Sequence, residues 1–213
     1  LPPYRKPNNI SEFVNYVHEL GYTDKEICFK PNTSKGGRGF RIINDKVSRL
    51  DTLLNSKLGN VYISLDESIS IFKESEVLPD IILMPVIAEP HFDAMSICYE
   101  GKELLTTIKT REGHRAGTIT QGALIENNEL VSLSRKILSH IPLSFNISIQ
   151  FIGNYLLEIN PRTSTYIYQD NLIEPYLSIK LCLGEYKPED IETYRSKVDF
   201  GRRMVRYFDQ HFF

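Results

Sequence analysis

Residues 150–162 have the sequence Gln150-Phe-Ile-Gly-Asn-Tyr-Leu-Leu-Glu158-Ile-Asn160-Pro-Arg162. The stretch carries an amide, a carboxylate, a second amide and a guanidinium along what its pattern predicts to be a β-hairpin. Oxygen ligands of this kind suit a hard cation such as Mg²⁺, which proteins commonly hold through one or two carboxylates together with substrate phosphates. A neighbouring guanidinium suits phosphate oxygens, which it can bind through two parallel hydrogen bonds. The hairpin is therefore a candidate site for a magnesium ion and a phosphorylated ligand.

The pairing of this hairpin decides whether its polar side chains share one face. Side chains alternate along a strand, so Gln150 and Glu158 share a face when they stand opposite each other. That pairing requires a three-residue loop, Gly153-Asn154-Tyr155, or a β-bulge. A two-residue Gly-Asn turn without a bulge would place the two side chains on opposite faces. We therefore predict the loop or the bulge; the alternative is a surface hairpin with a solvated polar face.

A glycine-rich segment lies upstream, at Lys30-Pro-Asn-Thr-Ser-Lys-Gly36-Gly37-Arg38-Gly39-Phe40. Three glycines in four positions allow backbone N–H groups to approach a phosphate closely. The pattern is neither that of a P-loop nor that of a Rossmann dinucleotide site. Lys30 ends an apolar run, which indicates a charge directed inward toward an anion; the alternative is an ordinary hairpin tip with a surface lysine. Together with the hairpin, the segment predicts a nucleotide–magnesium enzyme.

Composition limits the class of protein. The 213 residues suffice for one domain or two small lobes, and 41% hydrophobic and 24% charged residues are ordinary for a globular protein. A net charge of −2 gives no overall electrostatic reason to expect nucleic-acid or membrane partners. No apolar run is long enough to cross a bilayer, and no secretory signal is visible. We expect a cytoplasmic protein.

The cysteines and histidines suggest no catalytic centre of their own. Cys28, Cys98 and Cys182 are scattered without zinc-like spacing, and we interpret all three as small core residues in a reducing compartment. The five histidines are dispersed, and none pairs with a recognisable nucleophile, so we assign no covalent catalysis. His114, in a basic loop, is either a substrate contact or a solvated loop residue.

Helical and strand patterns alternate in two clusters, which predicts an α+β fold with two lobes. Pro85 indicates an edge or irregular position in its strand, and residues 110–128 predict a long loop or weak strand. Helices are expected near residues 11–20, 50–58, 64–72, 130–141 and 175–183, and strands near 26–30, 38–43, 81–87, 92–99, 103–109, 146–151 and 155–160.

The ordered set of motifs resembles the ATP-grasp superfamily, in particular its carbamoyl-phosphate synthase large-subunit-like and biotin-carboxylase-like branch. The match covers nearly the whole chain, and its strongest element is Glu158-Ile159-Asn160-Pro161-Arg162. The motifs are, in order, Phe29-Lys30-Pro31, Gly36-Gly37-Arg38-Gly39, Leu83-Met84-Pro85-Val86, Phe92-Asp93, Gln150-Phe151, the Glu158–Arg162 element, and Pro175-Tyr-Leu-Ser-Ile-Lys-Leu-Cys-Leu-Gly184-Glu185.

The resemblance implies an ATP-grasp fold in which ATP lies between a small lobe, residues 1–86, and a large lobe, residues 87–213. Lys30 would contact the α- and β-phosphates. The loop from Ser34 through Gly36, Gly37, Arg38 and Gly39 would cover the β- and γ-phosphates. The backbone of Met84, Pro85, Val86 and Ile87 would form the hinge that recognises adenine.

The same resemblance assigns the large lobe's residues. Gln150, Glu158 and Asn160 would hold Mg²⁺, with Mn²⁺ as the alternative cation, and Arg162 would stabilise the transferring phosphoryl group or acyl phosphate. Arg162 and Lys30 are thus the expected catalytic residues. A looser match places Lys109, Arg111 and Arg115 where relatives keep basic residues that face phosphate and substrate.

Three departures from the family pattern matter. Pro85 replaces the glutamate that many relatives carry in the hinge. The segment Ala88–Asp93 is short and brings either Glu89 or His91 near the usual ribose-binding position. The Rossmann-like domain that precedes the lobes in relatives is absent, which raises the alternative of a fragment with impaired turnover.

The resemblance implies an ATP-dependent ligase that activates a carboxylate or bicarbonate as an acyl phosphate, which an amine or similar nucleophile then attacks, with release of ADP. The expected partners are small-molecule substrates and the missing N-terminal domain, and the oligomeric state is open. The alternatives are a non-catalytic nucleotide-binding module and an α+β partner-binding domain without a nucleotide.

Overall fold

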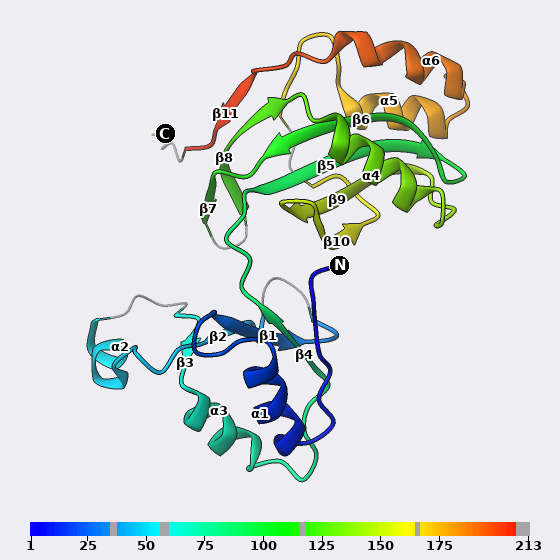
Figure 1. The fold of residues 1–213 in the computed structure, drawn as a ribbon. Helices are drawn as coiled ribbons and strands as arrows, with labels where there is room; N and C mark the ends of the chain where they lie inside the picture. The colour runs from blue at the N-terminus through cyan, green and yellow to red at the C-terminus, as the bar shows by residue number, and fades with distance from the viewer. Residues whose placement is uncertain (35–37, 56–59, 116–117, 165–166, 208–213) are drawn as a thin grey trace, which may run out of the picture. The chain divides into compact units, whose positions relative to one another are not determined.

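The computed structural model describes residues 1–34, 38–55, 60–115, 118–164 and 167–207 (Figure 1). The chain forms two compact units, Leu1–Ala88 and Glu89–Phe213. Each unit contains a β-sheet, its own helices and its own hydrophobic core. The expected α+β class with two lobes is confirmed.

The first unit is a four-stranded sheet in the order β3-β2-β1-β4. Its elements are β1 (Ile27–Pro31), β2 (Arg41–Ile43), β3 (Tyr62–Ile63), β4 (Ile81–Pro85), α1 (Ile10–Glu19), α2 (Arg49–Asn55) and α3 (Leu65–Phe72). Helices α1 and α3 cover the same face of the sheet (Figure 1). Between them, the rings of Phe13, Phe29 and Phe72 pack edge to face with centroids 5.1–5.8 Å apart. Strand β4 is an edge strand and ends at Pro85, as the proline predicts.

The second unit is built on a larger antiparallel sheet in the order β10-β9-β5-β6-β8-β11, with β7 paired to β8. Its strands are β5 (His91–Tyr99), β6 (Lys102–Thr110), β7 (Gly113–Arg115), β8 (Thr118–Ile125), β9 (Phe145–Ile152), β10 (Tyr155–Asn160) and β11 (Arg203–Val205). Its helices are α4 (Asn128–Leu138), α5 (Glu174–Cys182), α6 (Pro188–Glu192) and the 3₁₀ helix η1 (Thr193–Lys197). The stretch 110–128 therefore contributes two strands rather than a long loop.

The two faces of this sheet have separate cores. Helix α4 packs on one face, against Ala94, Ile108, Ile147 and Ile149. Helices α5 and α6 pack on the other face, against Ile97 and strand β6. Because side chains alternate along each strand, the face beneath α5 also receives the polar residues that alternate with Ile147 and Ile149. That face carries the candidate site.

Two of the three cysteines are core residues, as expected, and the third is not. Cys28 and Cys98 are buried, and burial raises their pKa to about 11 and about 12 respectively. Cys182 is exposed, so its interpretation as a core residue was wrong: it lies at the last position of α5, on the side of the helix turned to solvent. None of the described helices is both long and apolar enough to cross a membrane.

Candidate functional site

The β9–β10 hairpin has the register that the candidate metal site requires. Its turn is Gly153-Asn154, so Tyr155 pairs with Ile152. A bulge between Leu156 and Glu158 then shifts the pairing, and Glu158 stands directly opposite Gln150. Of the two arrangements predicted from the sequence, the bulge is confirmed and the three-residue loop is wrong. Gly153 has a φ of +54°, a conformation that favours glycine at this tight turn.

The paired hairpin residues belong to a polar row that crosses four strands. Asp93 on β5 stands opposite Gln150, and Lys109 on β6 stands opposite Asp93. The row is therefore Glu158, Gln150, Asp93 and Lys109, on β10, β9, β5 and β6. We call these four residues the polar row. All four side chains point to the same face of the sheet, the face that α5 covers farther along.

Hydrogen bonds hold the candidate metal ligands, one of them between two ligands and the others to arginines. Asn160 Nδ2 donates to Glu158 Oε1 at 2.8 Å, and Arg162 Nη2 donates to Asn160 Oδ1 at 3.4 Å. Arg111 Nη1 donates to Gln150 Oε1. Gln150 is buried, whereas the Glu158 and Arg162 side chains are exposed. The three side chains are thus neighbours on the hairpin, with the Asn160 nitrogen directed at Glu158 and the Asn160 and Gln150 oxygens each directed at an arginine. A cation entering from solvent would meet the exposed Glu158 carboxylate.

Arg111 brings a second cationic group to the hairpin. Burial lowers the pKa of its guanidinium, and the carboxylates of Asp93 and Glu158 act in the opposite direction. A guanidinium nevertheless stays charged in proteins. A metal ion bound through Gln150 Oε1 would compete with Arg111 for that oxygen, and displacement would free the guanidinium for a phosphate or carboxylate.

The donor set fits a hard cation. Within the described residues, no group of three or more His, Cys, Asp and Glu side chains could hold a metal ion, so a zinc-type centre finds no support there. The hairpin offers instead one carboxylate and two amide oxygens. Such a set suits Mg²⁺ that completes its coordination with water and substrate phosphates.

Lys109, at the β6 end of the polar row, is completely buried from solvent. Its Nζ lies 3.0 Å from Glu174 Oε1, and the two side chains are 0% and 1% exposed. Thr107 Oγ1 donates to the same carboxylate oxygen. A ligand could touch the Lys109 ammonium only by opening this buried pair. Neither Glu174 nor Asp93 was assigned a role from the sequence. The signal that could have found Glu174 is an acidic residue at the start of a largely apolar helix.

In the first unit, Lys30 lies in β1 between the core residue Phe29 and the end of the strand, and its side chain is half-buried. Ser34 Oγ donates to the carbonyl of Arg38 at 2.9 Å. Gly39 has a φ of +75°, and a Cβ there would lie 2.7 Å from the Pro31 ring, so both backbone conformation and space require glycine. Gly36 and Gly37 lie outside the described residues.

The candidate adenine hinge begins at the end of β4. Cys28 Sγ lies 3.4 Å from the carbonyl of Met84, and the N–H of Val86 donates to the carbonyl of Glu26 at 2.8 Å. Because that N–H is engaged, an adenine contact by Val86 would use its carbonyl. Pro85 has no N–H to offer, and Ile87 follows at the end of the unit.

The two candidates for ribose contact lie at the first residue of β5 and two residues before it. His91 is the first residue of β5 and pairs with Ile152, and its carbonyl accepts from Arg111 N at 2.9 Å. Glu89 packs beside Gly153, where a Cβ would lie 3.2 Å from Glu89 Cβ. Both therefore adjoin the hairpin turn, and the choice between them stays open. The side chains of His114 and Arg115 are outside the described part of the chain.

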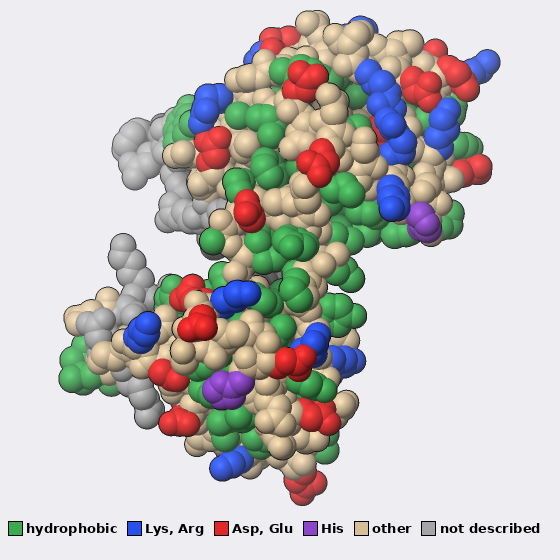
Figure 2. All heavy atoms as spheres, in the orientation of Figure 1, with side chains coloured by type: hydrophobic (Ala, Val, Ile, Leu, Met, Phe, Trp, Pro, Cys, Tyr) green, Lys and Arg blue, Asp and Glu red, His purple; other side chains and the backbone are tan. Residues whose placement is uncertain are grey.

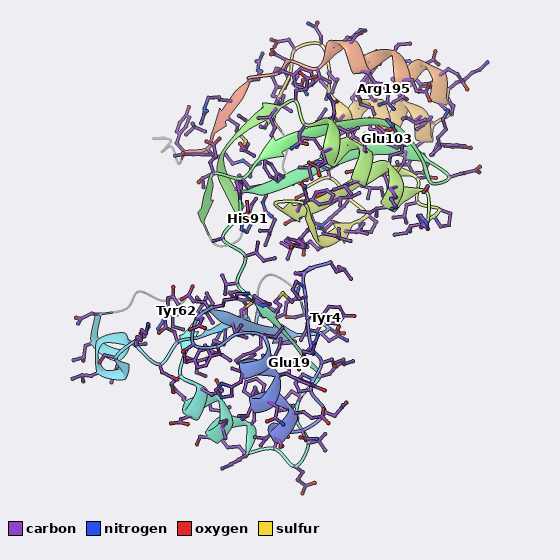
Figure 3. The ribbon with its side chains drawn as sticks, viewed as in Figure 1. Tyr4, Glu19, Tyr62, His91, Glu103 and Arg195 are labelled. Carbon is purple, nitrogen blue, oxygen red and sulfur yellow. The ribbon has the colours of Figure 1, made fainter. Side chains whose placement is uncertain are left out.

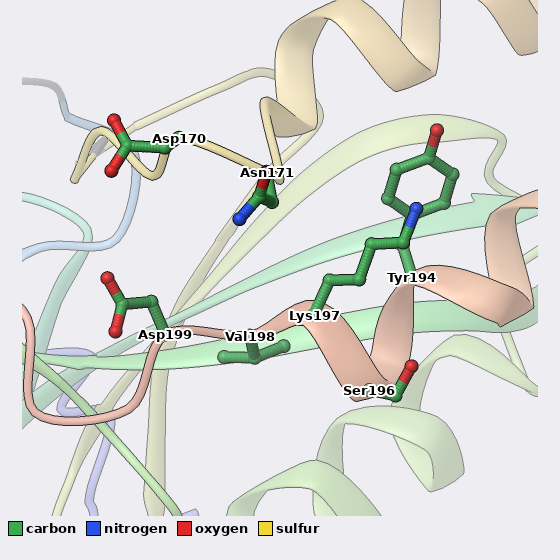
Figure 4. A pocket seen from close by; sticks show the side chains of 7 residues that line it. All are labelled: Asp170, Asn171, Tyr194, Ser196, Lys197, Val198 and Asp199. Carbon is green, nitrogen blue, oxygen red and sulfur yellow. The ribbon is translucent and has the colours of Figure 1, made fainter.

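A hollow of about 670 Å³ lies elsewhere on the second unit (Figure 4). Figure 4 shows its lining side chains on two segments, the loop at Asp170 and Asn171 and the stretch from Tyr194 to Asp199. None of the candidate site residues lines it. This hollow therefore adds nothing to the hairpin site.

Comparison with known proteins gives fold likeness without close sequence similarity. No protein-family model and no curated protein matches the chain. Among solved structures, it resembles the biotin carboxylase domain of Hydrogenobacter thermophilus 2-oxoglutarate carboxylase in complex with MgADP, ADP and bicarbonate. The two are 17% identical with a TM-score of 0.58, over 88% of this chain and 43% of that one.

Two further structures show the same likeness. N5-carboxyaminoimidazole synthetase from Staphylococcus aureus, complexed with ADP, is 12% identical with a TM-score of 0.54, over 92% of this chain and 46% of that one. Carboxyaminoimidazole ribonucleotide synthase from Aspergillus clavatus, complexed with ATP, is 14% identical with a TM-score of 0.54, over 76% and 41%. The chain thus spans less than half the length of these structures.

Proposed function

We propose that this chain, which has the ATP-grasp fold, is the ATP- and magnesium-dependent portion of a ligase. In the proposed reaction, ATP phosphorylates a carboxylate or bicarbonate to an acyl phosphate, an amine or similar nucleophile displaces phosphate, and ADP is released. The observation that carries the proposal is the bulged hairpin, which sets Glu158 opposite Gln150 with Asn160 and Arg162 hydrogen-bonded beside them.

Gln150, Glu158 and Asn160 are the residues that we assign to the metal. When bound, magnesium supplies positive charge to the β- and γ-phosphates. Lys30 binds the α- and β-phosphates, and the loop containing Ser34, Arg38 and Gly39 lies over the phosphate chain. Arg162 binds the transferring phosphoryl group, where a guanidinium stabilises the charge of the transition state.

The similar solved structures support the use of ATP and magnesium and a general ATP-dependent ligase, while the residue roles are our proposal. Their bound molecules include MgADP and bicarbonate in one case and ATP in another. Because those chains are more than twice as long as the part matched here, we propose that a further domain completes the substrate site. The same length difference favours a second candidate function. In it, this chain binds ATP but does not turn it over unless the further domain is present.

The test is ADP release in a coupled assay with Mg²⁺, ATP, and either bicarbonate or a panel of carboxylates, each with and without an amine. We expect a carboxylate-dependent rate that Arg162→Ala lowers by about 10²–10³-fold, as loss of one transition-state donor does elsewhere, while Mg-ATP still binds. The exposed Arg206→Ala variant serves as the control and keeps the rate.

Two outcomes would decide against parts of the proposal. Mg-ATP binding without ADP release for any substrate would leave the binding module as the better description. A rate that Arg162→Ala leaves unchanged would remove the catalytic role of Arg162 while keeping the ligase activity.

A further inference from the structure

We propose that Glu174 is a positioning residue of the candidate site: it anchors Lys109 and thereby fixes the polar row that presents Gln150 and Glu158. The inference rests on the function proposed above. Glu174 does not touch the metal or the nucleotide; it acts through Lys109. Helix α5 thus supports the metal-binding hairpin, although the two are separate in the sequence.

The contacts place Glu174 at the inner end of the row. Its Oε1 accepts from Lys109 Nζ at 3.0 Å and from Thr107 Oγ1, and both donors belong to β6. Lys109 stands opposite Asp93, and Asp93 stands opposite Gln150. Asp93 Oδ1 also accepts from Ser148 Oγ at 2.8 Å. Each step from Glu174 to the hairpin is therefore a direct contact or a facing pair in the sheet.

The Glu174 carboxylate is the acceptor that the Lys109 ammonium contacts in the buried layer. Asp93 and Lys109 are 0% exposed and Glu174 is 1% exposed, and Arg111 lies beside them on the same face. The Lys109 ammonium thus contacts the Glu174 carboxylate, and the Arg111 guanidinium is attracted by the carboxylates of Asp93 and Glu158. If Glu174 were replaced by glutamine, Asp93, which stands opposite Lys109 and accepts from Ser148, would be the remaining buried carboxylate of the layer for the Lys109 ammonium. Gln150 stands opposite Asp93, so a change in the contacts of Asp93 would alter the environment of the Gln150 side chain.

Stability alone does not explain why Glu174 is present. A buried ion pair is often no more stabilising than apolar residues of similar volume. This pair is also incompletely satisfied, because Glu174 Oε2 has no hydrogen-bond partner among the described residues. The buried Ser178 Oγ, one turn later on α5, likewise has none there. A group that orients a binding residue from behind gives a reason to keep such a pair, as outer residues do around metal ligands.

The chain contains a matched control in Glu103. This carboxylate is also buried, and it accepts from Arg135 Nε at 3.1 Å, from Arg195 Nη2 at 2.9 Å and from Thr106 Oγ1. Each of the two carboxylates thus accepts from one of the adjacent threonines Thr106 and Thr107 of β6. Glu103 is six residues from Lys109 along β6, about 20 Å away at the usual rise of a strand.

Figures 2 and 3 locate this control. Lys and Arg side chains gather on the right of the second unit in Figure 2. Figure 3 shows Glu103 beside Arg195, away from His91, which begins β5 at the hairpin end of the sheet. Glu103 is therefore a buried, charge-paired carboxylate of the same unit that does not support the polar row.

The experiment compares Glu174→Gln with Glu103→Gln by calorimetric titration of ATP in the presence of Mg²⁺, at a temperature where both variants are folded. We expect both substitutions to lower Tm. Glu174→Gln should also raise the Kd for Mg-ATP by about 10–100-fold, the usual effect of losing a group behind a metal ligand. Glu103→Gln should leave that Kd unchanged. Glu174→Asp, which keeps the charge but shortens the side chain, replaces Glu174→Gln if the latter does not fold.

A second readout needs no ligand. The side-chain amide signal of Gln150 in the ¹⁵N–¹H NMR spectrum should shift in the Glu174 variant and stay in place in Glu103→Gln. An unchanged Kd and an unchanged Gln150 signal in the Glu174 variant, or equal changes in both variants, would overturn the positioning role. If the unmodified chain bound no Mg-ATP, the proposed function would fail, whereas the Gln150 signal would still decide the role of Glu174.

Discussion

Glu158→Ala is expected to abolish the magnesium-dependent part of ATP binding and to leave the chain folded. Glu158 supplies the sole carboxylate among the three assigned metal ligands, so its loss removes the charge that attracts a divalent cation. We expect the Kd for Mg-ATP to rise by at least about 100-fold, the upper end of the effect of a group that only supports a ligand. Calorimetric titration in the presence of Mg²⁺ measures it.

The fold should tolerate this substitution. Glu158 is exposed on β10, an edge strand, and its hydrogen-bond partner Asn160 can turn to water instead. Substitutions at such surface positions usually change the free energy of unfolding by no more than about 0.5 kcal/mol. Glu129→Ala is the matched control, because Glu129 is an exposed carboxylate that accepts from Asn154 in the turn of the same hairpin. Equal Mg-ATP affinity in Glu158→Ala and Glu129→Ala would contradict the metal assignment.

Lys30→Met is expected to weaken ATP binding by about 10–100-fold, which is what losing a charged hydrogen bond of about 1.5–3 kcal/mol produces. Methionine keeps the apolar stem of the half-buried side chain and removes the ammonium. The loss should persist when Mg²⁺ is chelated, since we assign Lys30 to the phosphates and not to the metal. The two substitutions therefore predict different dependences on Mg²⁺.

Lys46→Met controls for the loss of a positive charge in the first unit. Lys46 is exposed and lies in the loop after β2. Its substitution should leave ATP affinity near that of the unmodified chain at moderate ionic strength, because exposed charges are screened beyond about 10 Å at 0.1 M salt. If both lysine variants lost the same affinity, Lys30 would contribute only a general charge effect.

The sequence predicted the hairpin well because few arrangements could bring its polar residues together. Alternation along two strands left only a longer loop or a bulge, and the bulge before Glu158 is what the structure contains. The choice between them was not available from the sequence, because a bulge depends on how both strands pack against their neighbours.

Other features depended on contacts between distant parts of the chain. The buried pair of Lys109 and Glu174 joins residues 65 positions apart, and no local pattern announces it. Lys109 was expected to face phosphate. In the structure its side chain lies under α5, where it pairs with Glu174. Cys182 was misplaced because α5 has apolar residues on both its buried and its exposed sides, including the exposed Tyr176 and Ile179. The roles assigned to the glycine loop and the hinge stay predictions.

The central claim is that this chain binds ATP through a metal held at the β9–β10 hairpin. The most direct test is a calorimetric titration of ATP into the unmodified chain, once with Mg²⁺ and once with the divalent cation chelated. We predict saturable binding with Mg²⁺ and a much higher Kd without it. Equal affinity in both titrations, or no binding in either, would contradict the claim.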